Sequence, residues 1–212
     1  ADGLSDFVRL ESQTTGYRRV VLHRNISRLD RAAAPVRGFA ETPIRFSDAP
    51  AFISFSDPNV RQMDVNFDKT SDWVRTDGQA FYFYWQDRSG EWRGLRRPFL
   101  DFDGIPSDFS FARGTTSNPA VQLADMNGDR LLDLVLLEYR AGPPARLTVS
   151  YWPYCGLGRW GERRELGQTI DLFDVPGTDD MLVQDLTGDG LADLAIMKPF
   201  GNWSELELRV NI

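Results

Sequence analysis

Acidic side chains recur at alternate positions in three short stretches, a spacing that can gather oxygen ligands around a cation. The clearest stretch is the nonapeptide 125–133, Asp-Met-Asn-Gly-Asp-Arg-Leu-Leu-Asp. Hard cations such as Ca²⁺ bind about six to eight oxygens from carboxylates, side-chain amides and backbone carbonyls. In a tight turn, the side chains at positions 1, 3, 5 and 9 and the carbonyl at position 7 can converge on one ion. We therefore expect a calcium loop here.

Two further stretches repeat this spacing. Residues 185–193 read Asp-Leu-Thr-Gly-Asp-Gly-Leu-Ala-Asp, and residues 64–72 give a looser version, Asp-Val-Asn-Phe-Asp-Lys-Thr-Ser-Asp. The residue at position 7 would bind through its backbone carbonyl. The predicted ligands are Asp64, Asn66, Asp68, Thr70 and Asp72; Asp125, Asn127, Asp129, Leu131 and Asp133; and Asp185, Thr187, Asp189, Leu191 and Asp193. The competing interpretation is a set of turns in which these side chains cap backbone N–H groups without a metal.

The loops recur about every sixty residues, since they begin at positions 64, 125 and 185. Each precedes an apolar segment, and each period holds about four short runs rich in Val, Leu and aromatic residues, separated by Gly, Pro, Asp and Asn clusters. These are strand and turn signals, and a fixed period of this length indicates a repeat architecture. We predict an all-β fold, a β-propeller with four-stranded blades. An irregular β-sandwich is the alternative, but it does not predict a repeated loop.

About three and a half blades are visible, fewer than the four to eight that close a propeller. The opening residues match the second half of a loop, with Asp2 and Asp6 at positions 5 and 9, and we expect this partial loop to hold no ion. One propeller segment then contains the units 1–63 (partial), 64–124, 125–184 and 185–212 (partial). We expect an arc of a larger propeller; the other option is that the two incomplete ends combine into a small closed ring.

The chain resembles the FG-GAP/VCBS repeat family, whose blades carry an Asp-x-Asn/Asp-Gly-Asp-Gly-x-x-Asp loop ahead of an apolar strand. Within that family it is most similar to the propeller region of the Spv/Tc-toxin B-component proteins, bacterial toxin-complex chains that also contain RHS repeats. The similarity rests on residues 55–61, 123–129 and 149–161 and extends over nearly the whole chain.

The resemblance implies an integrin-like propeller that binds Ca²⁺ structurally. It also implies protein partners, namely the pore-forming A component of a toxin complex and the rest of the parent chain, where this region would form part of a shell around a toxic C-terminal segment. A secreted or cell-surface location follows from the same resemblance, although the sequence contains no targeting signal.

Several residues depart from the family pattern. Phe67, Lys69 and Arg130 stand where glycine is usual, and a side chain is strained at loop positions that need a positive φ angle. We therefore expect the first of the three loops to bind a cation weakly or not at all. Tyr154 and Cys155 replace an asparagine and an apolar residue that the family pattern leads us to expect.

Composition argues against two classes of function. The 212 residues have a net charge of −7, and their basic residues are scattered among acids. Nucleic-acid binding requires clustered Lys and Arg, so we expect no nucleic-acid partner. No apolar run reaches the roughly eighteen residues of a membrane-spanning helix, so we expect no membrane insertion.

We also expect no enzymatic activity. The loop carboxylates leave little open coordination for a catalytic metal. The single histidine, His23, lies in a strand pattern, and the sequence contains no Gly-x-Ser-x-Gly element typical of serine hydrolases. A reactive thiol at Cys155, with Arg159 nearby, and a glycosidase-like pair of carboxylates are the alternatives.

Aromatic residues alternate along the predicted strands 80–85 and 146–152. The sets are Phe81, Phe83 and Trp85; Tyr82 and Tyr84; and Tyr151 and Trp152. We expect them to pack between blades, because alternate side chains share one face of a strand. If they instead form carbohydrate-stacking platforms, the chain would be a glycan-binding lectin or adhesin module, or an accessory domain of a polysaccharide-active enzyme. The favoured function is a calcium-stabilised scaffold and protein-docking module of a toxin-complex-type protein.

Overall fold

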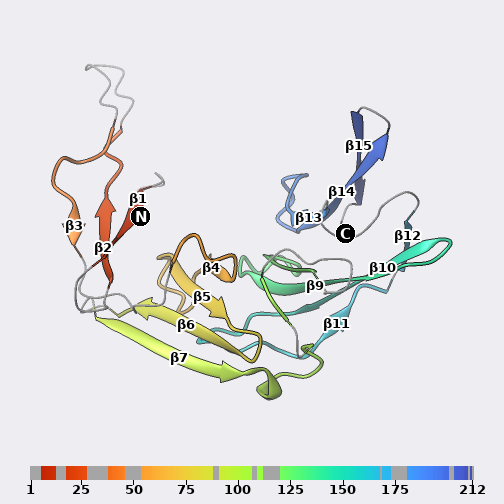
Figure 1. Ribbon diagram of the computed structural model, residues 1–212, viewed down its shortest axis with the longest axis horizontal. Helices are drawn as coiled ribbons and strands as arrows, with labels where there is room; N and C mark the ends of the chain where they lie inside the picture. Colours follow the sequence, from red (N-terminus) through yellow and green to blue (C-terminus); the bar gives the residue numbers. More distant parts are fainter. Residues whose placement is uncertain are drawn as a thin grey trace.

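The fold is built from β-strands and one short 3-10 turn, as the periodicity predicts (Figure 1). The computed structural model describes residues 6–12, 18–27, 38–45, 54–87, 91–106, 109–111, 120–167, 169–172, 181–200, 203–209 and 211. These residues form four antiparallel sheets, none of which closes on itself. The all-β prediction is confirmed. Asp2 lies outside the described residues.

The sheets follow one another along the chain. The first sheet contains β1 (Phe7–Ser12), β2 (Arg18–His23) and β3 (Ile44–Arg45), and the second contains β4 (Val60–Met63), β5 (Asp72–Thr76), β6 (Ala80–Gln86) and β7 (Trp92–Pro98). The third contains β8 (Ala120–Ala124), β9 (Asp133–Arg140) and β10 (Ala145–Trp152), with β11 (Arg164–Glu165) and β12 (Ile170–Leu172) both paired to β10. The fourth contains β13 (Met181–Gln184), β14 (Asp193–Phe200) and β15 (Trp203–Arg209). The 3-10 turn η1 (Phe99–Asp101) follows β7.

Each predicted cation loop connects the first two strands of a sheet, β4 to β5, β8 to β9 and β13 to β14. Sequence periodicity predicts the strands that follow the loops. Periodicity does not predict the strands that precede the loops. β4 and β13 have only four residues each and β8 has five, which are too few to show a clear alternation. Apart from β11 and β12, which both pair with β10, strands adjacent in the chain are adjacent in the sheet, as short connections between antiparallel strands permit.

Strand register gives every sheet two distinct faces, because directly opposite residues and residues two apart along a strand point the same way. We call one face of each sheet the leading face. It contains the residue that follows the last aspartate of the loop, namely Phe7, Trp73, Leu134 or Leu194. The opposite, trailing face contains the next residue, namely Val8, Val74, Val135 or Ala195.

The trailing face of each of the first three sheets packs against the leading face of the next. The three contacts are Val8 against Trp73 and Tyr84; Val74, Phe81 and Phe83 against Leu134, Leu136 and Trp152; and Val135, Leu137 and Val149 against Val183, Leu194 and Ile196. Phe81, Phe83 and Trp152 are 0% exposed. The prediction that the aromatic sets pack between sheets is therefore confirmed for these residues.

Polar contacts reinforce the stacking of the third sheet on the fourth. The Gln122 side chain on β8 donates from Nε2 to the carbonyl of Met181 (2.9 Å), and its Oε1 accepts the N–H of Val183 (2.9 Å). The side-chain amide of Gln122 thus makes a donor and an acceptor hydrogen bond to the edge strand β13, as the backbone of a neighbouring strand would. The four sheets follow a curved path, with β1–β3 at one end and β13–β15 at the other (Figure 1).

The turn at Gly156 gives a test of how tightly the sheets stack. An alanine Cβ there would lie 2.2 Å from Phe67 Cε2, and Gly156 has a φ of +81°. We expect Gly156→Ala to reduce the free energy of unfolding by about 2–4 kcal/mol, the sum of a left-handed backbone and a steric clash. The measurement is urea denaturation with chelator present.

Gly188→Ala is the matched control, because Gly188 has a φ of +82° and nothing within 4 Å of the added Cβ. It should cost only the backbone term of about 1–2 kcal/mol. Equal losses in the two variants would contradict the close contact between Gly156 and Phe67.

Candidate metal-binding loops

The first aspartate of each loop caps the turn that follows it. Its two carboxylate oxygens accept the N–H groups of position 6 and of position 4 or 5. The pairs are Asp64 with Asp68 (3.2 Å) and Lys69 (2.9 Å), Asp125 with Gly128 (2.8 Å) and Arg130 (2.7 Å), and Asp185 with Gly188 (2.6 Å) and Gly190 (3.1 Å). These bonds match the capped-turn interpretation. Each oxygen has two lone pairs, so capping does not preclude a cation.

Positions 3 and 5 are also joined to each other and to the backbone. The position 5 carboxylate accepts the N–H of position 7, in Asp68 from Thr70 (2.8 Å), in Asp129 from Leu131 (2.9 Å) and in Asp189 from Leu191 (2.9 Å). The amides of Asn66 and Asn127 donate to the same carboxylates at 2.9 and 3.0 Å. In the third loop, the Thr187 N–H bonds instead to Asp193 (3.1 Å).

Positions 4 and 6 adopt the left-handed backbone conformation. The φ angles are +78° at Gly128, +82° at Gly188 and +91° at Gly190, and +65°, +65° and +68° at Phe67, Lys69 and Arg130. The expected strain at the three non-glycine residues is thus present, at about 1–2 kcal/mol each. The loop at 64–72 contains two of these strained residues, Phe67 and Lys69.

The last aspartate of each loop ties the loop to the far end of its own sheet. One oxygen of Asp133 accepts the N–H of Met126 (3.1 Å) and the other accepts the N–H of Tyr154 (2.9 Å). Equivalent pairs are Val65 and Gln86 on Asp72, and Leu186 and Asn211 on Asp193. Asp6 accepts the N–H of Asn25 (2.7 Å) in the same way. Asp6 therefore occupies position 9, where the sequence places it.

Burial acts on the pKa values of these last aspartates. Burial raises the pKa of Asp72 to about 7 against the hydrogen bonds from Val65 and Gln86, and the charges of Asp68 and Asp64 raise it further. Burial likewise raises the pKa of Asp133 to about 6. For Asp193, burial also raises the pKa, but the hydrogen bonds it accepts outweigh burial and hold the pKa below its ordinary value.

The loop at 64–72 brings its acidic groups closest together. Carboxylate oxygens of Asp64, Asp68 and Asp72 all lie within 4.8 Å of one another, the only such group of acidic, histidine or cysteine ligands among the residues described. Three hard oxygen donors at this separation suit Ca²⁺ or Mg²⁺ and not Zn²⁺, which prefers nitrogen and sulfur. The loop that departs most from the family pattern is thus the one whose carboxylates lie closest together among the described residues.

The residues beyond each loop that donate to its last aspartate were not predicted from the sequence. Two of them also bond to the loop of the preceding sheet. We call Asn25, Gln86, Tyr154 and Asn211 the anchor residues. The Tyr154 hydroxyl donates to the carbonyl of Val65 (2.9 Å), and Asn211 Nδ2 donates to the carbonyl of Met126 (3.2 Å). Val65 and Met126 are both at position 2 of the preceding sheet's loop.

Tyr154 therefore does with a hydroxyl what Asn211 does with an amide, which explains a tyrosine where asparagine was expected. It also holds the turn that faces the 64–72 loop, since its hydroxyl accepts the N–H of Gly158 (2.9 Å), and Leu157 N–H bonds to Val65 (2.8 Å). The anchor residues follow the last aspartates at different distances, from 14 positions (Asp72 to Gln86) to 21 positions (Asp133 to Tyr154), so no fixed spacing in the sequence identifies them.

The residues considered for catalysis are dispersed. His23 lies on β2, where its ring is 5.8 Å from that of Phe7 and its Nε2 accepts a hydrogen bond from Arg9 (3.3 Å). Cys155 is exposed in the turn after β10, and its thiol is 3.6 Å from the carbonyl of Pro153. No helix in the described ranges is long and apolar enough to cross a membrane.

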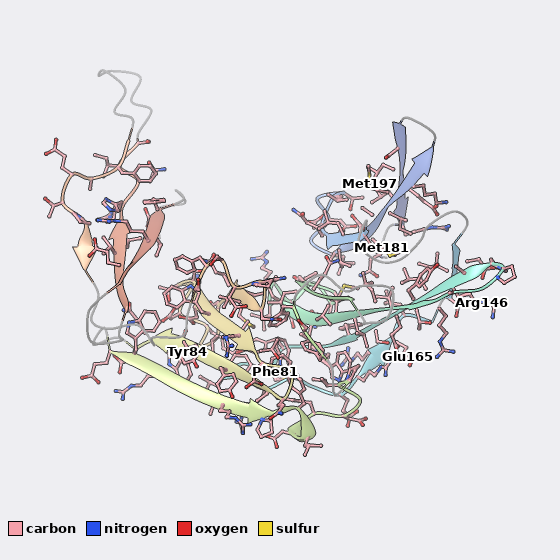
Figure 2. All side chains as sticks on the ribbon, viewed as in Figure 1. Phe81, Tyr84, Arg146, Glu165, Met181 and Met197 are labelled. Carbon is pink, nitrogen blue, oxygen red and sulfur yellow. The ribbon has the colours of Figure 1, made fainter. Side chains whose placement is uncertain are left out.

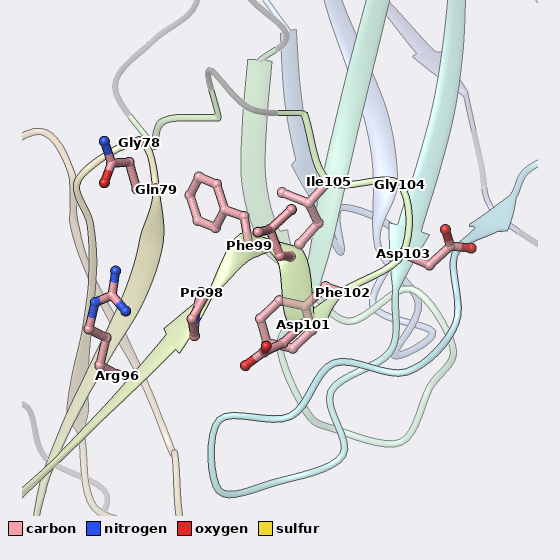
Figure 3. A pocket seen from close by; sticks show the side chains of 11 residues that line it. Gly78, Gln79, Arg96, Pro98, Phe99, Asp101, Phe102, Asp103, Gly104 and Ile105 are labelled. Atoms are coloured by element: carbon pink, nitrogen blue, oxygen red, sulfur yellow. The ribbon is translucent and has the colours of Figure 1, made fainter.

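A surface groove lies beside η1, at the end of β7 (Figure 3). It has a volume of about 790 Å³, and its polar lining comes from Gln79, Arg96, Asp101 and Asp103. Leu100 at its rim is 98% exposed. The groove lies outside the three loops and contains none of the predicted ligands.

Replacing Asp133 tests its structural role. Asp133 is 0% exposed, so Asp133→Asn leaves a buried N–H group facing an amide nitrogen. We expect a loss of about 2–4 kcal/mol in urea unfolding with chelator present. The exposed Asp129→Asn variant should change stability by less than about 1 kcal/mol. If Asp129→Asn loses as much stability as Asp133→Asn, the hydrogen bonds to the buried Asp133 carboxylate do not have this structural role.

The raised pKa of Asp72 predicts a pH dependence of stability. The folded chain binds a proton at Asp72 more readily than the unfolded chain, whose aspartates have pKa values of about 3.9. The stabilisation from the protonation of Asp72 is complete below about pH 4 and is lost as the pH rises through 7. Asp133 contributes in the same direction, and its contribution is lost as the pH rises through about 6.

We therefore expect the urea midpoint, with chelator present, to fall as the pH increases from 5.5 to 8. In Asp72→Asn the fall should be smaller, because the amide does not titrate. The same slope in both proteins would show that Asp72 ionises normally in the folded chain.

Comparisons with known proteins find similarity at the level of structure. No protein-family model matches the chain, and no curated protein sequence matches it. Among solved structures, the chain is similar to one in the Photorhabdus luminescens Tc holotoxin pore, determined with a mutation in TccC3, at a TM-score of 0.50 and 18% identity. The match covers 100% of this chain but only 9% of that one. At this identity the likeness concerns the fold, and this chain is similar to a small part of a Tc toxin protein.

Proposed function

We propose that this chain is a segment of a calcium-stabilised β-propeller that serves as scaffold and docking module in a larger toxin-complex-type protein. The proposal rests on repetition. Three antiparallel sheets have the same loop between their first two strands, and all four sheets stack in the same order, trailing face on leading face, at three interfaces. Propellers repeat four-stranded sheets in this manner around an axis.

The likeness to a chain of the Tc holotoxin pore supports the toxin-complex part of the proposal, because it extends over the entire chain. We include in the proposal a protein partner in such a complex, the pore-forming component, and a secreted or cell-surface location. We also propose that the chain has no catalytic activity of its own and acts by holding and presenting surfaces.

Calcium is proposed for the loops because acidic groups lie along each of them, and those of 64–72 and 125–133 repel one another. In the 64–72 loop, Asp64 and Asp68 raise the pKa of Asp72 through their charge. A divalent cation among these three would offset the repulsion, and oxygen ligands suit Ca²⁺. The loops at 125–133 and 185–193 would hold ions through the side chains and carbonyls named above, with the same turn geometry.

The glycan-binding alternative loses its main support. It needs accessible aromatic faces, but Phe81, Phe83 and Trp152 are 0% exposed and Tyr84 is 6% exposed. Trp73 and Trp92 stack on each other at 4.8 Å in the contact with the first sheet. The alternative of an accessory domain in a polysaccharide-active enzyme depends on the same aromatic side chains, so their burial weakens that alternative as well.

Thermal melts with Ca²⁺ and with chelator test the metal part of the proposal. A ligand that binds only the folded state stabilises it by about 2.7 kcal/mol at a hundred times its Kd. We expect Ca²⁺ to raise the Tm, and Asp68→Ala, Asp129→Ala and Asp189→Ala each to remove part of the rise.

Asp101→Ala is the matched control, because Asp101 is exposed on η1 outside the loops. It should leave the Ca²⁺-dependent rise unchanged. If Ca²⁺ does not change the Tm of the unsubstituted chain, the loops are capped turns without metal, and the calcium part of the proposal is wrong.

A further inference from the structure

Strand β7 forms a long outer edge of the second sheet. It pairs with β6 at every position from Trp92 opposite Gln86 to Pro98 opposite Ala80, and no strand among the described residues pairs with its other side. β7 lies along the outer margin of the curved stack (Figure 1). The outward N–H and C=O groups of an edge strand can pair with another extended chain.

The third sheet does not have an edge of this kind. There the corresponding place beside the third strand is occupied by β11 and β12, which have two and three residues and pair with opposite ends of β10. Short edge strands protect a sheet against pairing with other chains. β7 has seven residues in continuous register, so the second sheet lacks the protection that a short edge strand gives.

The charges on β7 favour one kind of added strand. Arg96 and Arg97 are adjacent and point to opposite faces, and neither forms an ion pair with a described residue. Arg96 is exposed and donates from Nε to the Tyr82 hydroxyl (3.3 Å), and the buried Nε of Arg97 has no hydrogen-bond partner in the described part of the chain. Arg93, in contrast, already pairs with two nearby acids. Arg96 and Arg97 would attract an acidic strand and repel the same edge of a second copy.

The groove beside η1 extends this surface beyond the end of β7. Arg96 and Pro98 point to the same face of β7, because they are two positions apart, and both line the groove (Figure 3). Phe102 also lines it, and Leu100 at its rim is 98% exposed. An apolar side chain of an added strand, two positions from the residue beside Arg96, would lie over Pro98 and reach the groove. Asp101 lies on the η1 side, so acidic side chains fit beside β7 and not here.

We propose that the outer edge of β7 binds an extended acidic segment of a partner protein by strand addition. Main-chain hydrogen bonds to β7 supply affinity, acidic side chains beside Arg96 and Arg97 supply charge complementarity, and an apolar side chain in the groove supplies specificity. The inference rests on the proposed docking function, because it identifies a docking surface for that function. It does not depend on cations in the loops or on a toxin complex.

Two synthetic peptides with a fluorescent label test this proposal, with chelator present. The acidic peptide, Thr-Val-Thr-Glu-Glu-Thr-Val-Thr, has the same order of residues in both chain directions, and the control peptide has Lys-Lys at its centre. We expect the acidic peptide to bind saturably and at least about tenfold more tightly than the control in fluorescence anisotropy titrations up to millimolar concentration. Binding should also slow hydrogen exchange of the β7 amides but not of the β9 amides, because strand addition protects the outward N–H groups.

Reversal of one charge gives the matched comparison. Arg96→Glu, with its fold checked by circular dichroism, should weaken binding of the acidic peptide at least about tenfold and strengthen binding of the lysine peptide. Arg146→Glu is the control, because Arg146 is exposed on β10, away from β7 (Figure 2). It should bind both peptides as the unsubstituted chain does.

Three results would each overturn the proposal: no binding of the acidic peptide, equal binding of the two peptides, or binding that leaves hydrogen exchange at β7 unchanged. A dimer of the chain with slowed exchange at β7, detected by sedimentation, would assign this edge to a second copy and overturn it as well. None of these results affects the calcium part of the proposed function, which the melts with Ca²⁺ and chelator decide separately.

Discussion

A buried carboxylate at the end of each loop is the constraint on which the sheets depend. Asp72, Asp133 and Asp193 are 2%, 0% and 0% exposed. A carboxylate removed from water must receive hydrogen bonds, and here they come from the second residue of its loop and from the anchor residue at the end of the third strand or just beyond it. One side chain therefore fixes the shape of the loop and the alignment of the two hairpins that it joins.

The anchor residues extend this constraint from one sheet to the next. Tyr154 receives its position from Asp133 and bonds onward to Val65 in the preceding loop. Asn211 does the same between Asp193 and Met126. The loops at 64–72 and 125–133 are thus each held by their own sheet and by the next one, so stability is shared mainly between nearest neighbours, as in other repeat proteins.

The loops combine this rigidity with concentrated negative charge. Phe67 and Lys69 hold left-handed conformations that cost free energy, and the carboxylates of Asp64, Asp68 and Asp72 nevertheless converge within 4.8 Å. The raised pKa of Asp72 expresses the cost of burial and of this convergence. Packing of the turn at Gly156 and Leu157 against Phe67 and Val65 holds the loop in place despite its strain.

Local spacing determined much of this protein. The alternate oxygen-bearing residues of 125–133 specify a capped turn, and the apolar run after Asp133 specifies β9, because both depend on residues within about ten positions of one another. The period of about sixty residues gives the number of loops, and the short apolar runs between turn residues give the all-β class. These features could be predicted from the sequence alone.

Tertiary structure decided the features that join distant residues. Tyr154 meets Val65 across 89 positions, and no local pattern identifies that pair. The hydrogen bond from the Leu157 N–H to the carbonyl of Val65 in the 64–72 loop likewise joins segments far apart in the sequence. Whether an apolar face such as that of Val135 is covered also depends on a neighbouring sheet, because burial is a property of the assembled stack.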